Sequence, residues 1–366
     1  MRPSLSWLLA FVPVTAALHF LAPHAHLWVF GAACAAIIPL AGWMGRATEH
    51  LAEHTGEGLG GLLNATFGNA AELIIAFAAL QHGLTAVVKA SLTGSILGNL
   101  LLVLGAAFLG GGLRKEIQTF NATAARMQAT MLMLAAVALV LPAGFHHLGG
   151  AVSPAREDRL SVWIAVVLLA CYALGLLFTL RTHRPLFSGT AGETEAVAHG
   201  EVWSLRKAIV VLALATAAVA WMSEILVASV EQAARAMGMT ELFVGVVVVA
   251  IIGNAAEHST AVLMARRDRM DLAVSIAIGS SIQIALFVAP VLVLASHFFG
   301  PAPMDFVFTP AEVMAVLVAV FASAQVASDG ESHWLEGAQL LAVYVLLGLL
   351  FYFLPASAGH VAPATP

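Results

Sequence analysis

Charged side chains are scarce in this sequence, and their scarcity excludes an ordinary soluble domain. Asp, Glu, Lys and Arg together make up only 10 % of the 366 residues, against about 25 % in a typical soluble protein. Apolar residues make up 60 % of the chain, and the mean hydropathy is +0.92. A chain of this composition is expected to fold inside a lipid bilayer.

Cysteine is almost absent, which excludes a disulfide-stapled secreted fold. Cys34 and Cys171 both lie inside apolar segments, where a packed or lipid-facing thiol is expected. The first apolar segment follows Arg2 and could be mistaken for a signal peptide, but nothing after it resembles a secreted domain. We therefore interpret it as a membrane helix.

Enzymatic signatures are also missing. The sequence contains no HExxH, no GxSxG and no cysteine-based catalytic pattern. An intramembrane enzyme is therefore a much weaker interpretation than a transporter, and no cofactor and no nucleic-acid partner is expected.

Long apolar runs fill most of the chain. About twenty apolar residues span a bilayer, and this criterion gives roughly eleven segments. They lie near 5–22, 27–45, 60–80, 88–109, 122–142, 160–180, 206–230, 241–264, 272–297, 310–327 and 335–354. The prediction is an all-α integral membrane protein with about 11 transmembrane helices.

The basic residues divide unevenly between the two sides of this topology. Four lie on one side, namely Lys89, Arg156, Arg159 and Arg235, and the other twelve Lys and Arg residues lie on the opposite side. The positive-inside rule then predicts a cytoplasmic N-terminus and an external C-terminus. We expect a multi-pass protein of a prokaryotic cytoplasmic membrane.

One short string occurs twice and indicates an internal repeat. GNAAE fills 68–72 and again 253–257, and Gly94-Ser95 recurs at the same offset of 185 residues as Gly279-Ser280. Matching segments three and four to eight and nine makes each repeat five helices long. An odd number of helices inserts the two repeats in opposite directions, as in many secondary transporters.

This pattern predicts the domain organisation. Residues 1–25 form an extra N-terminal transmembrane helix, 26–181 the first five-helix repeat, 182–205 a cytoplasmic linker, and 206–366 the second five-helix repeat. The substrate site is expected near the membrane midplane, between the two inverted repeats.

A glutamate in each repeat is the strongest functional signal. An ionised carboxylate at the bilayer centre costs about 2.5 to 3.5 kcal/mol, yet Glu72 and Glu257 lie at equivalent places in apolar segments. Asn69 and Asn254 precede them by three residues, which on a helix puts each Asn and Glu on one face. The preceding glycines permit close helix approach or a local helix break.

These side chains predict a cation site. Two carboxylates, two amide oxygens, hydroxyls and carbonyls are the hard oxygen ligands that Ca²⁺ prefers. Mn²⁺ accepts similar ligands, and His258 could assist it. Interhelical hydrogen bonding alone is the weaker interpretation, because polar contacts between membrane helices usually use Ser, Thr or Asn.

Other polar residues form a second tier of candidate ligands. Thr66 extends the first polar stripe, and helices four and nine carry Ser91, Ser95, Asn99, Ser280, Ser281 and Gln283. Gly94, Ser95 and Gly98 equally suit close helix packing. Glu49 and Glu224 lie near helix ends, where a vestibule role competes with direct ligation. Glu312 follows Pro310, where compensation of the helix dipole is favoured.

The sequence resembles the calcium/proton exchanger (CAX) family of the cation/calcium antiporter superfamily. The resemblance covers nearly all of segments two to eleven and is carried by GLLNATFGNAAELI (61–74), GSILGNLLLVLG (94–105), IIGNAAEH (251–258), GSSIQIALFVAP (279–290) and DGESHWLEG (329–337). Sodium/calcium exchangers of the same superfamily instead carry a Gly-Thr-Ser-x-x-Glu type pattern at the first motif.

The resemblance implies a lone first helix, two inverted five-helix repeats, and exchange of cytoplasmic Ca²⁺ for H⁺ by alternating access. It implies that Glu72 and Glu257 bind the cation and the protons, and His258 is a candidate for proton coupling. Gly98 stands where the family commonly has Ser. An Mn²⁺/H⁺ or Na⁺/H⁺ antiporter is the runner-up, and a passive cation channel is less favoured.

Overall fold

The fold was obtained as a computed structural model, and it describes residues 5–55, 57–148, 153–186 and 203–355. Apart from two residues at each of two short strands, its regular structure is helical. Long apolar sequences form helices in a bilayer because a helix satisfies its backbone hydrogen bonds internally. The chain is an all-α integral membrane protein.

The first half of the chain supplies three long helices and several shorter ones. After a 3₁₀ turn at Leu5–Ala10, they are α1 (Phe11–Leu21), α2 (His26–Thr55), α3 (Glu57–Phe67), α4 (Ala70–Gln81), α5 (Thr85–Leu97), α6 (Leu104–Gly112), α7 (Ala122–Leu148) and α8 (Pro154–Leu177). A π-helical turn at Gly98–Val103 joins α5 to α6 into one continuous rod, and another at Phe178–Thr182 extends α8.

The second half repeats this plan. Its helices are α10 (Leu205–Ala236), α11 (Glu241–Phe243), α12 (Ala250–Gly253), α13 (Ala255–Arg266), α14 (Met270–Gln283), α15 (Ala289–Ser296), α16 (Pro310–Val326) and α17 (Trp334–Phe353). π-helical turns at Val244–Val249 and Ile284–Val288 join α11 to α12 and α14 to α15.

Seven of the described helices are long and apolar enough to cross a membrane, and an eighth span results if the bent pair Glu241–Gly253 and Glu257–Arg266 is taken as one. Three shorter apolar helices, Ser6–Leu21, Ala70–Gln81 and Pro310–Val326, coincide with the predicted segments one, three and ten. The count of eleven spans stays a prediction.

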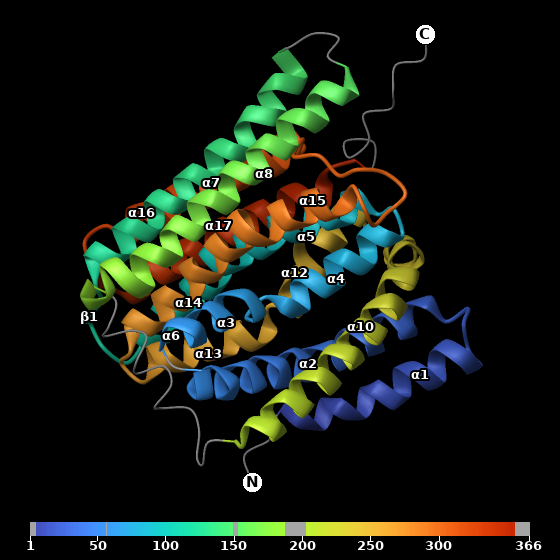
Figure 1. The fold of residues 1–366 in the computed structure, drawn as a ribbon, viewed down its shortest axis with the longest axis horizontal. Helices are drawn as coiled ribbons and strands as arrows, with labels where there is room; N and C mark the ends of the chain where they lie inside the picture. Colours follow the sequence, from blue (N-terminus) through green and yellow to red (C-terminus); the bar gives the residue numbers. More distant parts are fainter. Residues whose placement is uncertain (1–4, 56, 149–152, 187–202, 356–366) are drawn as a thin grey trace.

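Helices from both halves pack together around the middle of the molecule. α2 lies along α10, α5 contacts the π-helical turn at Val244–Val249, and α6 contacts α13 and α17. In Figure 1, α1, α2 and α10 lie along one side, α7 and α8 along the opposite side, and α4, α12 and α14 between them. The broken helices are therefore central.

A short antiparallel pairing closes one end of the bundle. β1 (Gln118–Thr119) pairs with β2 (Glu331–Ser332), with Gln118 opposite Ser332, and both of these side chains are buried. Glu312 is also buried, and it forms a capping box with Thr309 at the start of α16. The predicted role of Glu312 at a helix start is confirmed.

Residues at the edges of this fold include two histidines and the predicted linker. His146 and His147 lie in the last turn of α7, where His146 Nδ1 is 2.7 Å from the Glu157 carboxylate. The acidic residues of the predicted linker, Glu193, Glu195 and Glu201, lie outside the described residues.

Candidate cation site

Both copies of the GNAAE string lie at helix breaks. Asn69 separates α3 from α4 with φ −103° and ψ 25°, and Asn254 separates α12 from α13 with φ −94° and ψ 7°. Asn leaves helical geometry readily because its amide competes for backbone groups. Each Asn and Glu pair therefore straddles a break, and does not form a stripe on one continuous helix.

The breaks place each glutamate in the first turn of a new helix, Glu72 in α4 and Glu257 in α13. Backbone N–H groups at a helix start favour negative charge. Neither Asn side chain caps its own helix. Both amides make contacts with other helices, and Asn254 Nδ2 also donates to the Ala250 carbonyl at 2.9 Å.

The two carboxylates lie close together. They are near enough for direct electrostatic interaction, and Ser280 donates a hydrogen bond to the Glu257 carboxylate. Glu72 packs against the second break, since a Cβ built at Gly253 would lie 3.4 Å from Glu72 Cγ. The missing side chain at Gly253 lets the first-repeat glutamate reach the second motif.

Amide side chains connect the two halves around these carboxylates. Asn254 Nδ2 donates to Ser95 Oγ at 2.9 Å, and Asn99 Nδ2 is 3.5 Å from Asn254 Oδ1. Asn69 Nδ2 donates to Gln283 Oε1. Each contact joins a residue before the linker to one after it, so the two halves meet here. We call Asn69, Glu72, Asn99, Asn254 and Glu257 the carboxylate–amide cluster.

The cluster holds oxygens that no protein donor satisfies. Among the described residues, Oε2 of Glu72, Oε2 of Glu257, Oδ1 of Asn69 and Oδ1 of Asn99 are buried without a hydrogen-bond partner. An unsatisfied buried polar atom costs about 1 to 3 kcal/mol. Four such oxygens in one cluster form a set of hard ligands for a cation.

His258 lies beside this cluster. Its Nε2 is also buried without a partner, and a Cβ built at Gly98 would lie 3.9 Å from that nitrogen. No group of three or more His, Cys, Asp and Glu side chains suited to a metal occurs in the described part of the chain. The cluster itself offers two carboxylates together with amide oxygens, and the hydroxyls of Ser95 and Ser280 lie beside them.

The structure brings some predicted ligands to the cluster and leaves others away from it. Ser95, Ser280 and Gln283 contact it directly. The hydroxyl of Thr66 donates to the Leu62 carbonyl at 2.8 Å, within its own helix. Glu224 lies instead 3.7 Å from His82 and is 47 % exposed. A role for Thr66 or Glu224 at the cluster is therefore not supported by their contacts.

Four further second-tier residues complete this comparison. Ser91 and Ser281 bond carbonyls of their own helices. Glu49 lies partly buried in α2. Asn99 had only second-tier status in the sequence, because the nearby Gly94, Ser95 and Gly98 equally suit close helix packing, yet its unpaired oxygen makes it a cluster member.

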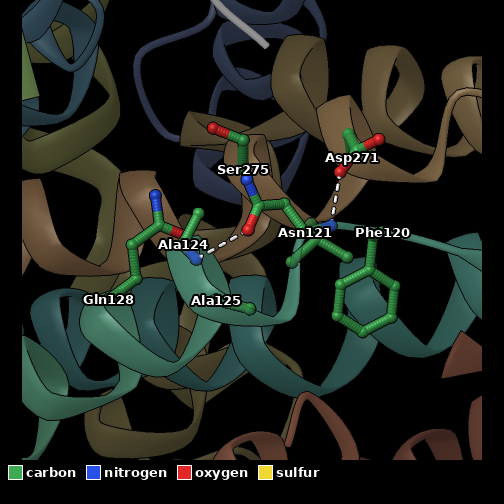
Figure 2. A pocket seen from close by; sticks show the side chains of 8 residues that line it. Phe120, Asn121, Ala124, Ala125, Gln128, Asp271 and Ser275 are labelled. Carbon is green, nitrogen blue, oxygen red and sulfur yellow. Dashed lines mark hydrogen bonds between the residues drawn. The ribbon is translucent and has the colours of Figure 1, made fainter. Parts of the chain in front are cut away.

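A small surface pocket lies elsewhere, between α7 and α14 (Figure 2). Its only carboxylate, Asp271, already accepts a hydrogen bond from the Asn121 backbone N–H at 2.6 Å, and Asn121 Oδ1 accepts from the Ala124 N–H at 3.0 Å. The pocket offers fewer charged ligands than the carboxylate–amide cluster.

The turn between α13 and α14, close to this pocket, is held by hydrogen bonds to Asp268. Asp268 has φ 64° and accepts hydrogen bonds from Lys115 and from Gln118, the latter at 2.8 Å. These two donors hold the pKa of the Asp268 carboxyl below its ordinary value. The equivalent position 185 residues earlier is Gly83, with φ 77°, so both turns use left-handed backbone.

Comparisons with known proteins relate this chain to cation exchangers. The sodium/calcium exchanger protein family matches residues 25–181 and 207–353. The "Ca(2+)/H(+) antiporter" of Aphanothece halophytica is 46 % identical over 361 residues, covering 95 % of this chain and 96 % of that protein. The "Ca(2+)/H(+) antiporter ChaA" of Bacillus subtilis is 48 % identical over 328 residues, covering 89 % and 92 %.

Solved structures of exchangers also have the fold of this chain. The structure of native YfkE has a TM-score of 0.83 and 43 % identity, and the match covers 96 % of this chain and all of that chain. An H⁺/Ca²⁺ exchanger CAX has a TM-score of 0.66 at 16 % identity, over 95 % and 91 % of the two chains; this match supports the fold alone.

Proposed function

This chain belongs to the sodium/calcium exchanger protein family, and we propose that it is a secondary active transporter that exchanges Ca²⁺ for H⁺. The observation that carries the proposal is the pair Glu72 and Glu257, close together at two helix breaks, each with a buried unpaired oxygen. Relatives of 46 % and 48 % identity are named Ca²⁺/H⁺ antiporters. The protein is a transporter rather than an enzyme.

The same oxygens can serve both ions. Ca²⁺ takes six to eight oxygen ligands and requires ionised carboxylates. Protons neutralise the same carboxylates when the cation has left. Two empty, charged carboxylates close together in a membrane are costly, so the protein changes its facing when the pair is loaded with Ca²⁺ or with H⁺. This rule prevents a leak of either ion.

The two helix breaks suit alternating access. In secondary transporters with inverted repeats, broken helices form the substrate site near the midplane, and one repeat moves against the other. We extend this plan to residues 26–181 and 206–366, with Asn69, Asn254, Ser95, Ser280 and Gln283 as further ligands or ligand-positioning residues. Equivalent breaks at Asn69 and Asn254 support it.

Counter-flux in proteoliposomes tests the function. Purified protein is reconstituted, a pH gradient is imposed, and Ca²⁺, Mn²⁺ and Na⁺ are offered in turn. Uphill Ca²⁺ movement driven by the gradient is the expected result, and downhill leakage alone would indicate a channel. Mn²⁺ is the second candidate substrate, because it accepts oxygen ligands similar to those of Ca²⁺. His258 Nε2, unpaired beside the cluster, could assist it. Greater uphill flux of Mn²⁺ or Na⁺ than of Ca²⁺ would reassign the substrate.

Competition between the ions predicts a pH dependence of binding. Apparent Ca²⁺ affinity should fall as pH drops, by about tenfold per pH unit for each proton displaced, without loss of sites. Calorimetry in buffers of differing ionisation enthalpy measures the protons released on Ca²⁺ binding. If none were released between acidic and neutral pH, a shared site would be ruled out.

We also propose that the protein lies in a prokaryotic cytoplasmic membrane with its N-terminus inside and its C-terminus outside. The support is the division of basic residues, twelve to four. A protease-accessible tag after Pro366 should be cut from outside intact cells, whereas a tag in the loop at 266–269 should be protected. A tag after Pro366 on the same side as that loop would contradict an odd number of spans.

A further inference from the structure

A second proton-responsive contact lies at the far end of α4 from the cluster. His82 follows the last residue of α4, and its Nε2 is 3.7 Å from the Glu224 carboxylate on α10. Figure 1 shows α4 and α10 as neighbouring rods from the two halves of the chain. Glu72 and His82 mark the two ends of α4, a helix of twelve residues, about 18 Å long.

The hydrogen bonding of His82 fixes its tautomer. Nδ1 is 2.9 Å from the carbonyl oxygen of Ala78, and a carbonyl can only accept, so Nδ1 carries the ring proton. In the neutral ring Nε2 then presents a lone pair to the Glu224 carboxylate, which also only accepts. A second proton on Nε2 converts this unfavourable contact into an ion pair.

Most charged groups on the neighbouring elements are paired with residues other than His82 and Glu224. The elements packed against α4 are α2, α5, α10, α12 and α15. At this end they, or the α15–α16 loop, carry the titratable or charged residues His26, Lys89, Glu224, Glu231, Arg235, His297 and Asp305. Lys89 pairs with Asp305, Arg235 with Glu231, and His297 with Asp158; α12 carries none.

We propose that His82 and Glu224 form a proton-operated latch that holds the predicted external ends of α4 and α10 together. This inference rests on the proposed function, because it takes the external proton as the counter-ion. Histidine changes charge between about pH 5 and 8. His82 and Glu224 are 44 % and 47 % exposed, so protons in solution reach them directly.

The latch gives the external proton two actions. Protons that arrive from outside neutralise Glu72 and Glu257, and the same acidity closes α4 onto α10 behind them. When Ca²⁺ is released into a less acidic exterior, the neutral His82 repels the Glu224 carboxylate and the ends separate. Proton loading from outside is thus coupled to closure of the external side, and a less acidic exterior favours its opening.

A distance measurement tests the latch without transport. Spin labels are placed on the exposed positions Gln81 and Ala228 as cysteines, in full-length protein with Cys34→Ala and Cys171→Ala, reconstituted in lipid nanodiscs. Between pH 8 and pH 5.5 the ratio of short to long distances should rise about two- to fivefold, the amount that an exposed ion pair supplies.

Variants at the pair and a matched control decide the outcome. His82→Gln and Glu224→Gln should each abolish the pH-dependent shift, and His82→Arg should keep the short distance at both pH values. His146→Gln, at a histidine whose carboxylate partner Glu157 lies on α8, should leave the shift unchanged. A shift that persists in both His82→Gln and Glu224→Gln, or that disappears in His146→Gln, overturns the latch.

Failure of the latch and failure of the proposed function are distinguishable. The distances are measured without Ca²⁺ flux, whereas the exchange itself is tested by counter-flux. Loss of the pH-dependent shift in wild-type protein that still exchanges Ca²⁺ for H⁺ would refute the latch alone.

Discussion

Replacing either cluster glutamate by glutamine should lower Ca²⁺/H⁺ exchange by about 100-fold or more. Residues that merely support a metal ligand are worth about 10- to 100-fold, and Glu72→Gln or Glu257→Gln removes a charged ligand itself. The amide keeps the size of the side chain but can neither neutralise Ca²⁺ nor take up a transported proton. One remaining carboxylate would face a divalent ion alone.

The measurement is initial Ca²⁺ uptake by proteoliposomes under a fixed pH gradient, with the amount of folded protein determined by size-exclusion chromatography. Glu331→Gln is the matched control, since it removes one acidic charge from an exposed residue of β2, and it should exchange at the wild-type rate. Folded Glu72→Gln or Glu257→Gln protein with wild-type exchange would remove the cluster from the mechanism.

The second large effect concerns a glycine. Gly94→Ala should destabilise the folded protein strongly, because a Cβ at Gly94 would lie 1.9 Å from the backbone oxygen of Val246. No side-chain rotation relieves a clash with backbone, so α5 must move away from the π-helical turn at Val244–Val249. Overpacking of this kind costs about 1 to 3 kcal/mol and occasionally more; we expect the upper end.

The internal repeat supplies the control for this prediction. Gly279 is equivalent to Gly94 in the sequence, but a Cβ there would meet nothing within 4 Å. Gly279→Ala should therefore melt with the wild type, whereas Gly94→Ala should melt about 5 °C or more lower, or fail to purify as a single species. Equal melting temperatures for the two variants would contradict the close contact.

This pair of glycines also shows what the sequence could and could not predict. The repeated Gly-Ser pattern left ligand positioning and helix packing equally open. The structure assigns close packing to Gly94 and not to Gly279, because the backbone of Val246 from the other half lies against Gly94, whereas nothing lies within 4 Å of a Cβ at Gly279. The sequence treats both positions alike, and the difference depends on how the helices cross.

The glutamates were predictable for a physical reason. A carboxylate in an apolar segment is costly, so two carboxylates at equivalent places of a repeat indicate a functional site. Comparison with relatives supports the predicted function. Asn99 had only second-tier status, because helix packing explained its segment equally well. The pairing of His82 with Glu224 depends on how α4 crosses α10, which no local pattern encodes.

The same inequality between the halves bears on energetics. Gly98 occupies the position equivalent to Gln283, and His258 the position equivalent to Leu73. Two identical inverted repeats would make the inward-open and outward-open forms mirror partners of equal free energy. Here Gln283 bonds Asn69 on one side of the cluster, while on the other His258 faces the bare backbone of Gly98. On the inverted-repeat plan the inward-open and outward-open forms therefore differ in free energy. Without bound ions, the site is open to one compartment more often than to the other.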